Sequence, residues 1–230
     1  MTVLENRYCI PETIDYRFRV KDPISAATHF AGFIAAILAM PFMMIRCSEA
    51  GCTPAEMAAC AVYILSMTVL YAASASYHSF HISEKADLIL KRIDHTSIFI
   101  MITGTYVPIC IAGIGGREGS VLLLTVFALA AAGIVYKLFF VTCPKWISSV
   151  IYSLLGWISI VRAPVIWHSL GTTGFLWLLA GGIIYTAGSV IYAIKPKFLT
   201  GRFSNHDLFH CFVLAGSVCH FITVYRCLVM

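Results

Sequence analysis

Charged residues are scarce in this chain of 230 amino acids, since Asp, Glu, Lys and Arg make up only 12% of it. Soluble globular domains carry about 25% charged residues, so the composition argues against a soluble protein. Hydrophobic residues make up 60% of the sequence, and the mean hydropathy is +0.86. Several stretches of about twenty residues have few or no charges, which is the length that an α-helix needs to cross a bilayer.

Other signals are also missing from the sequence. The nine cysteines form no CxxC pair and are interpreted as small buried side chains. Cys47 and Cys52 share one short loop and could form a disulfide, although nothing in the sequence requires it. The first 22 residues contain no apolar core followed by a small-residue cleavage site, so no cleaved signal peptide is expected. The net charge of +5 does not indicate a nucleic-acid partner.

The long apolar stretches predict seven transmembrane helices, because backbone groups in lipid must form their hydrogen bonds within the segment. The predicted spans are about Ile24–Ile45, Ala55–Phe80, Ile93–Ile114, Ser120–Val141, Ile147–Trp167, Thr173–Ile194 and His206–Val229. The connections between them are short. The sequence therefore predicts an all-α, polytopic seven-transmembrane-helix bundle over residues 23–230, preceded by a cytoplasmic N-terminal segment of residues 1–22.

The distribution of Lys and Arg predicts the orientation of this bundle. Alternate connections place twelve of these residues on the side of the N-terminus and four on the other side. The twelve are Arg7, Arg17, Arg19, Lys21, Lys85, Lys91, Arg92, Lys137, Lys145, Lys195, Lys197 and Arg202, and the four are Arg46, Arg117, Arg162 and Arg226. Positive charge accumulates on cytoplasmic loops, so the N-terminus is expected inside the cell and the C-terminus outside.

Ionisable residues inside a membrane are costly and mark functional sites. Here they gather near the predicted cytoplasmic ends of three spans. The second span ends with Ser74 and His78, the third begins with Asp94, and the seventh begins with His206 and His210. Residues four apart on a helix share one face, so His206 and His210 can reach the same object in the bundle interior.

Three imidazoles with a nearby carboxylate are typical of a catalytic zinc site, in which the fourth position is left for water. In this interpretation His78, His206 and His210 bind Zn²⁺, and Asp94 contacts the metal through water or acts as the general base. Ser74 holds the water, the substrate carbonyl or an imidazole. His220 lies ten residues beyond His210, about 15 Å along the helix axis, so it is expected outside the site.

The same residues carry a resemblance to a known family. The segments SASYH, DHTSIFIMITGTYVP and HDLFHCFVLAGSVCHF resemble the hemolysin III family, the bacterial branch of the progestin and adipoQ receptor family, from about Ser25 to the C-terminal end. The resemblance implies a seven-helix bundle in the plasma membrane of a bacterium, with zinc near its cytoplasmic side. It also implies His78, His206 and His210 as ligands, Asp94 as a contact through water, and Ser74 as a polar partner. The adiponectin-receptor branch is associated with ceramidase-like amide hydrolysis.

These observations favour a zinc-dependent hydrolase that acts on a membrane lipid amide or ester. Two alternatives stay open. The first is a non-enzymatic regulator of membrane homeostasis, or a receptor-like protein, in which zinc is a structural clasp. The second is a pore-forming hemolysin, which ranks last because no stripe of charged residues runs through all the spans.

Overall fold

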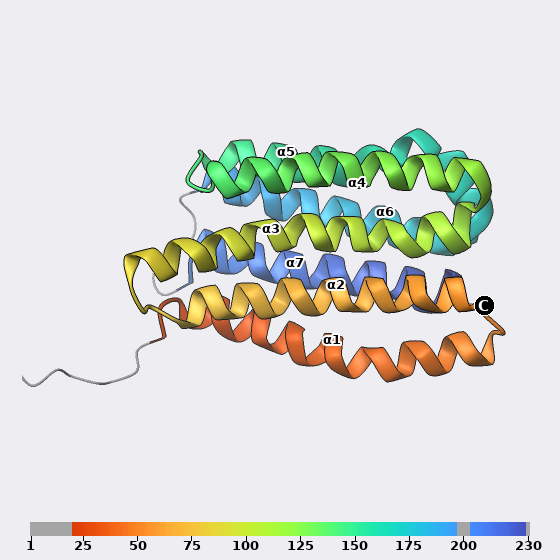
Figure 1. Cartoon of the computed structure of the whole chain (residues 1–230), viewed down its shortest axis with the longest axis horizontal. Helices are drawn as coiled ribbons and strands as arrows, with labels where there is room; N and C mark the ends of the chain where they lie inside the picture. Colours follow the sequence, from red (N-terminus) through yellow and green to blue (C-terminus); the bar gives the residue numbers. More distant parts are fainter. Residues whose placement is uncertain (1–19, 197–202, 229–230) are drawn as a thin grey trace, which may run out of the picture.

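The computed structural model describes residues 20–196 and 203–228, which form a bundle of α-helices running along the long axis of the molecule (Figure 1). The helices are α1 (Pro23–Glu49), α2 (Pro54–Ser79), α3 (Glu84–Pro108), α4 (Gly116–Phe139), α5 (Lys145–Trp157), α6 (Ala163–Ile194) and α7 (Asn205–Ile222). A π-helical turn, Ile109–Ile114, follows α3, a 3₁₀ turn, Ile158–Arg162, joins α5 to α6, and a second π-helical turn, Thr223–Leu228, follows α7. Residues 1–19 of the predicted cytoplasmic segment lie outside the described residues. The same holds for Lys197, Arg202 and Val229.

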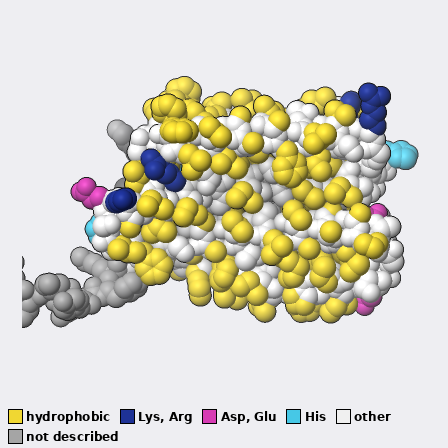
Figure 2. Space-filling model, viewed as in Figure 1, with side chains coloured by type: hydrophobic (Ala, Val, Ile, Leu, Met, Phe, Trp, Pro, Cys, Tyr) yellow, Lys and Arg dark blue, Asp and Glu magenta, His cyan; other side chains and the backbone are white. Residues whose placement is uncertain are grey.

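The surface of the bundle has the character of a membrane protein. Large apolar side chains point outward along its length, with Phe42, Leu124 and Phe139 exposed by 60%, 69% and 73%. On the face drawn in Figure 2, hydrophobic side chains cover the middle, and the charged side chains lie at the two ends. Six segments of the described chain are long and apolar enough to cross a membrane: Pro23–Glu49, Pro54–Ser79, Glu84–Ile114, Gly116–Phe139, Lys145–Ile194 and Asn205–Arg226. The chain is therefore an all-α polytopic membrane protein.

The number of these segments differs from the seven predicted spans. The fifth and sixth predicted spans both fall within Lys145–Ile194, because the connection between them, residues 168–172, is short and contains no Asp, Glu, Lys or Arg. Gly171 interrupts this stretch with φ 64° and ψ 174°, a backbone conformation that glycine adopts most readily. The two sides of the interruption pack together, since Ser149 donates to the carbonyl of Ser189 and the Trp157 indole donates to Thr186 Oγ1 at 2.9 Å. Judged by length and composition alone, this stretch is one segment, although it folds back on itself at the interruption.

Polar caps fix where α3 and α7 begin. Ser83 accepts a hydrogen bond from the backbone of Ala86 and starts α3 at Glu84. The predicted start near Ile93 is therefore wrong, and Asp94 lies in the third turn of α3 instead of the first, because the capped helix continues beyond the apolar stretch. Ser204 and Asp207 form a reciprocal capping box at the start of α7.

Small residues allow the helices that carry the site residues to approach closely. A Cβ atom added to Gly104 of α3 would collide with the side chain of Ser66 in α2. The Tyr71 hydroxyl of α2 donates a buried hydrogen bond of 2.6 Å to Ser217 of α7. Helices α2, α3 and α7 are therefore held together at the centre of the bundle. Cys47 and Cys52, which could form a disulfide on the sequence evidence, are both free thiols.

Candidate metal centre

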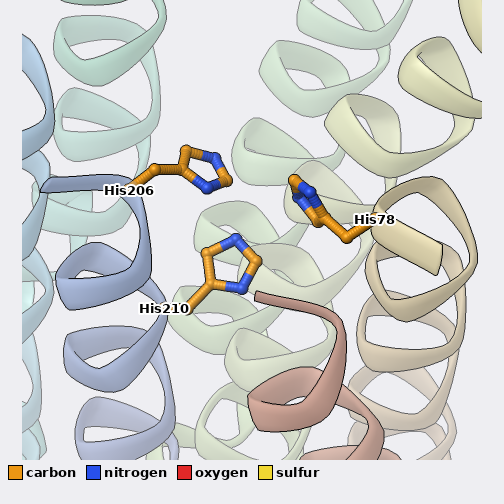
Figure 3. Close-up of side chains that lie close together, drawn as sticks. All are labelled: His78, His206 and His210. Carbon is orange, nitrogen blue, oxygen red and sulfur yellow. The ribbon is translucent and has the colours of Figure 1, made fainter. Parts of the chain in front are cut away.

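Three histidines from two helices meet at the end of the bundle where α2 ends and α7 begins (Figures 1 and 3). His78 comes from the last turn of α2, and His206 and His210 come from the first turns of α7. One nitrogen from each imidazole lies within 4.8 Å of the other two, a spacing at which they could hold a metal ion. Figure 3 shows the three rings turned toward one another. We refer to this end of the molecule as the histidine end.

The start of α1 supplies an oxygen to each of these imidazoles. His78 Nδ1 lies 2.8 Å from the Asp22 carboxylate. His206 Nδ1 lies 3.2 Å from the Ser25 hydroxyl, and His210 Nδ1 lies 3.3 Å from the Ser25 carbonyl oxygen. In each of the three histidines, the nitrogen that contacts Asp22 or Ser25 is therefore Nδ1.

These contacts assign the tautomer of each ring. A carboxylate and a carbonyl only accept hydrogen bonds, so the Nδ1 atoms of His78 and His210 must donate. The Ser25 hydroxyl gives its own hydrogen to Asp207 at 2.7 Å, so His206 Nδ1 must donate to Ser25. Each neutral imidazole then carries its lone pair on Nε2.

A metal ion fits this arrangement. Metal-bound histidines donate their second N–H to a carboxylate, carbonyl or hydroxyl oxygen, which fixes the tautomer and the ring orientation. His78 Nε2 is buried and has no hydrogen-bond partner among the described residues. An unpaired polar atom in a buried position is costly, and coordination to a cation would satisfy it. Three imidazole nitrogens at this spacing could together hold a metal ion.

The structure brings Asp94 and Ser74 to the same place. Both are buried, with 8% and 2% of their surface exposed, and both line a cavity that is also lined by His206 and His210. Asp94 lies 3.3 Å from Nδ1 of its neighbour His95. The Ser74 hydroxyl forms no hydrogen bond with another described side chain, and Ser74 lines the cavity.

The cavity has a volume of about 200 Å³ and extends along the bundle away from the histidines. Its far end is lined by Ile109, which directly follows α3, and by Ile166, which lies in the first turn of α6. His206 and His220 of α7 both line it, and fourteen residues of helix separate them by about 21 Å. The lining between is mostly apolar, so the cavity suits an extended hydrocarbon chain.

Three residues beside the cluster extend the site predicted from the sequence. Asp22 and Ser25 are absent from that prediction. The third residue is His29, whose ring stacks on His210 with centroids 3.7 Å apart. The three residues are spaced i, i+3 and i+7 at the start of an apolar helix, which places them on one face and is the signal that could have found them.

The comparisons with known proteins agree with this picture. Residues 18–221 match the family described as haemolysin-III related. The chain belongs to this family. It is 34% identical over 208 residues to the hemolysin-3 homolog of Bacillus subtilis strain 168, covering 90% of this chain and 94% of the relative. It is 36% identical over 206 residues to hemolysin-3 of Bacillus cereus, covering 89% and 91%.

A more distant relative extends the relationship beyond bacteria. The haemolysin-III-related chain is 26% identical over 181 residues to the heptahelical transmembrane protein ADIPOR2 of Oryza sativa subsp. japonica, covering 71% of this chain and 79% of the relative. The resemblance seen in the sequence motifs is thereby confirmed, both for the hemolysin III family and for the adiponectin receptor-like superfamily.

Proposed function

We propose that this protein is a Zn²⁺-dependent hydrolase that cleaves an amide or ester bond of a membrane lipid. The observation that carries the proposal is the position of the histidine cluster at one end of a long apolar cavity, with His206 and His210 belonging to both. A lipid lying in this cavity would present a bond near its headgroup to the cluster. The family membership supports a membrane role.

Each residue of the site has a part in the proposed reaction. Zn²⁺, when bound by His78, His206 and His210, would polarise the carbonyl and lower the pKa of water to about 7. Asp94 takes the proton of the attacking water and delivers it to the leaving amine or alcohol as general base and then general acid. Ser74 donates a hydrogen bond that orients the carbonyl or the water. Asp22 and Ser25 keep the imidazoles in the tautomer that binds metal.

The test is lipid turnover by the purified protein in proteoliposomes. Asp94→Ala should reduce turnover by about 100-fold to 10,000-fold, the usual contribution of a general base, and should keep the metal. Asp87→Ala removes a carboxylate from the same helix, where Asp87 pairs with the exposed His81 at 2.7 Å, and should change turnover little. Equal turnover by wild type and Asp94→Ala would contradict the mechanism.

A structural role for the metal is the second candidate. The three histidines join α2 to α7, and their Nδ1 partners lie at the start of α1, so a bound ion would tie together helices far apart in the sequence. A receptor-like or regulatory protein could use such a clasp without catalysis. In that case a chelator lowers the thermal unfolding temperature, and the wild type releases no product from amide or ester lipids.

The chain, in this proposal, crosses the membrane seven times with its N-terminus in the cytoplasm. The non-helical backbone at Gly171 and the packing of α5 against the end of α6 support two crossings within Lys145–Ile194. The excess of Lys and Arg on the side of the N-terminus supports the orientation. Reporter fusions in the loops after α1 and after α4 should report opposite sides of the plasma membrane, with the second one inside the cell.

A further inference from the structure

Three cysteines gather at the end of the bundle opposite the histidine end, where α1 connects to α2 (Figure 1). Cys47 lies in the last turn of α1, Cys52 lies in the connection, and Cys60 lies in the second turn of α2. Cys47 and Cys60 are fully buried, whereas Cys52 is partly exposed. The Cys47 thiol is close enough to interact with the thiols of both Cys52 and Cys60. Cys47 therefore lies next to one thiol that solvent reaches and one that it does not.

The backbone at the end of α1 brings Cys47 and Cys52 together. The Cys52 N–H donates to the Cys47 carbonyl oxygen at 2.9 Å, and the Gly51 N–H donates to the Ser48 carbonyl oxygen at 3.2 Å. With Gly51 at φ 67°, these two hydrogen bonds form a Schellman motif. The side chains at the two ends of this motif commonly pack against each other, and here both of them are thiols.

The start of α2 holds Cys52 from its other side. The Thr53 N–H donates to the Glu56 carboxylate at 2.8 Å, and the Thr53 hydroxyl accepts from the Glu56 N–H, which forms a capping box. Cys52 thus lies between a glycine turn and a capped helix, so its backbone is held on both sides. Closing a bond between thiols that are already held in place costs little additional conformational entropy.

A metal ion fits the three cysteines less well than a covalent bond does. Among the residues that the structure describes, three ligand atoms lie within 4.8 Å of one another only in the histidine cluster. The cysteines instead offer Cys47 as a shared partner with one neighbouring thiol on each side. This arrangement suits thiol–disulfide exchange, in which one thiolate at a time attacks a sulfur atom.

We propose that Cys47 and Cys52 form a site that is oxidised by a small-molecule disulfide and closes into an intramolecular disulfide bond. The Cys52 thiolate first attacks one sulfur of the oxidant, whose other half leaves as a thiolate. The Cys47 thiolate then attacks the Cys52 sulfur of this mixed disulfide and releases the second half. The two cysteines lose two electrons in total, and the oxidant becomes two thiols that take up the two cysteine protons.

The exposure of the thiols and the proposed orientation agree with this order of steps. Only Cys52 meets solvent, so the oxidant enters there, and the buried Cys47 completes the bond. In the proposed orientation this end of the molecule lies outside the cytoplasm, where disulfides form and persist. The site does not depend on the proposed hydrolase, whose metal centre lies at the opposite end.

The test treats the reduced protein in nanodiscs with oxidised glutathione and maps the products by mass spectrometry without reduction. Cleavage after Glu49 and Glu56 places the three cysteines on separate fragments. Burial raises the pKa of the Cys52 thiol, so the reaction is run at about pH 9, where more thiolate is present. The fragments of Cys47 and Cys52 should be joined, with the loss of two hydrogen atoms. A link from Cys47 to Cys60, or no link, would overturn the proposal.

Single variants separate the two steps. Cys47→Ala keeps a small apolar side chain at the buried position but removes the second thiol, so Cys52 should retain one glutathione as a mixed disulfide. Cys52→Ala should leave Cys47 and Cys60 unmodified, because solvent reaches neither of them. The control, Cys211→Ala, removes a partly exposed thiol of α7 and should give the same link as wild type. Glutathione retained on Cys52 in wild type, or modification of Cys47 in Cys52→Ala, would contradict the proposed sequence of steps.

Discussion

The cavity has two unlike ends, and α7 contributes a histidine to each. At the histidine end, His210 meets His78 and His206, and its Nδ1 is bound to an oxygen of α1. At the other end, which we call the far end, His220 lies against Tyr185, and its Nε2 is 3.2 Å from the carbonyl oxygen of Leu178. His210 and His220 lie on the same helix, but only His210 has other imidazoles within coordination distance.

The comparison of the two ends shows what a histidine in a membrane helix requires before it can bind a metal ion. A helix can supply two imidazoles one turn apart, as α7 does with His206 and His210, but the third must come from elsewhere. The oxygens that fix the tautomers also come from a different helix. At the far end the neighbours of His220 are the Leu178 backbone carbonyl and the Tyr185 ring, and no other imidazole of the described chain meets it, so we interpret His220 as a packing residue.

The largest expected effect is loss of metal when the cluster is removed. His206→Ala combined with His210→Ala leaves one imidazole, which cannot hold Zn²⁺ in a tetrahedral site. Wild type should carry about one Zn²⁺ per chain, and the double variant less than about a tenth of that. Elemental analysis of the purified proteins measures both. The matched control is His220→Ala at the far end, which should keep its metal, and similar metal loss in the control would remove the distinction between the two ends.

Asp22 tests whether the oxygens of α1 matter to the metal. Asp22→Asn replaces the carboxylate that fixes His78, and it should weaken metal affinity by about 10-fold to 100-fold, as is usual for such partners. Competition with a chromogenic chelator measures the affinity. Asp87→Asn changes an equally short His–Asp pair on the surface, at 2.7 Å, and should leave the affinity unchanged. An unchanged affinity in Asp22→Asn would show that the ring is held by packing alone.

The variant Gly181→Ala tests whether the packing of the far end affects the metal site. A Cβ atom at this position would collide with the His220 ring, so Gly181→Ala should displace His220 from Leu178 and cost about 1–3 kcal/mol of stability. The thermal unfolding temperature should fall while the metal content stays at the wild-type value. Gly156→Ala is the control, because its Cβ would meet nothing within 4 Å. Metal loss in Gly181→Ala would show that the two ends are coupled.

The smallest expected effects come from deleting one hydroxyl at each end. Ser25→Ala removes the acceptor for His206 and the donor to Asp207, and Tyr106→Phe removes the donor to the Gly156 carbonyl at 2.8 Å. Each should cost about 1 kcal/mol of stability. Only Ser25→Ala should weaken metal binding in the chelator assay. Equal affinities in the two variants would limit the role of Ser25 to packing.

Much of this protein was predictable from local sequence patterns. The apolar stretches predicted helices of membrane-spanning length, and each predicted span overlaps a helical segment of the described chain. The spacing of His206 and His210 predicted a shared face. The number of segments differs between prediction and structure, because the connection at residues 168–172 is short, carries no Asp, Glu, Lys or Arg, and interrupts the helix only at Gly171. The start of α3 was missed because a serine cap extends a helix beyond its apolar part.

The sequence by itself determined that the chain is helical, resides in a membrane and carries an imidazole pair on one helical face, because periodicity and hydropathy act over neighbouring residues. The placement of polar residues and the family resemblance also predicted His78 as the partner of this pair, but only the tertiary structure decided which oxygens hold the three imidazoles. His78 and His210 are 132 positions apart in the chain, and Ser25 is 185 positions from His210. Contacts over such separations depend on how the helices pack, and helix packing is set by the fit of side chains across interfaces that no local pattern describes.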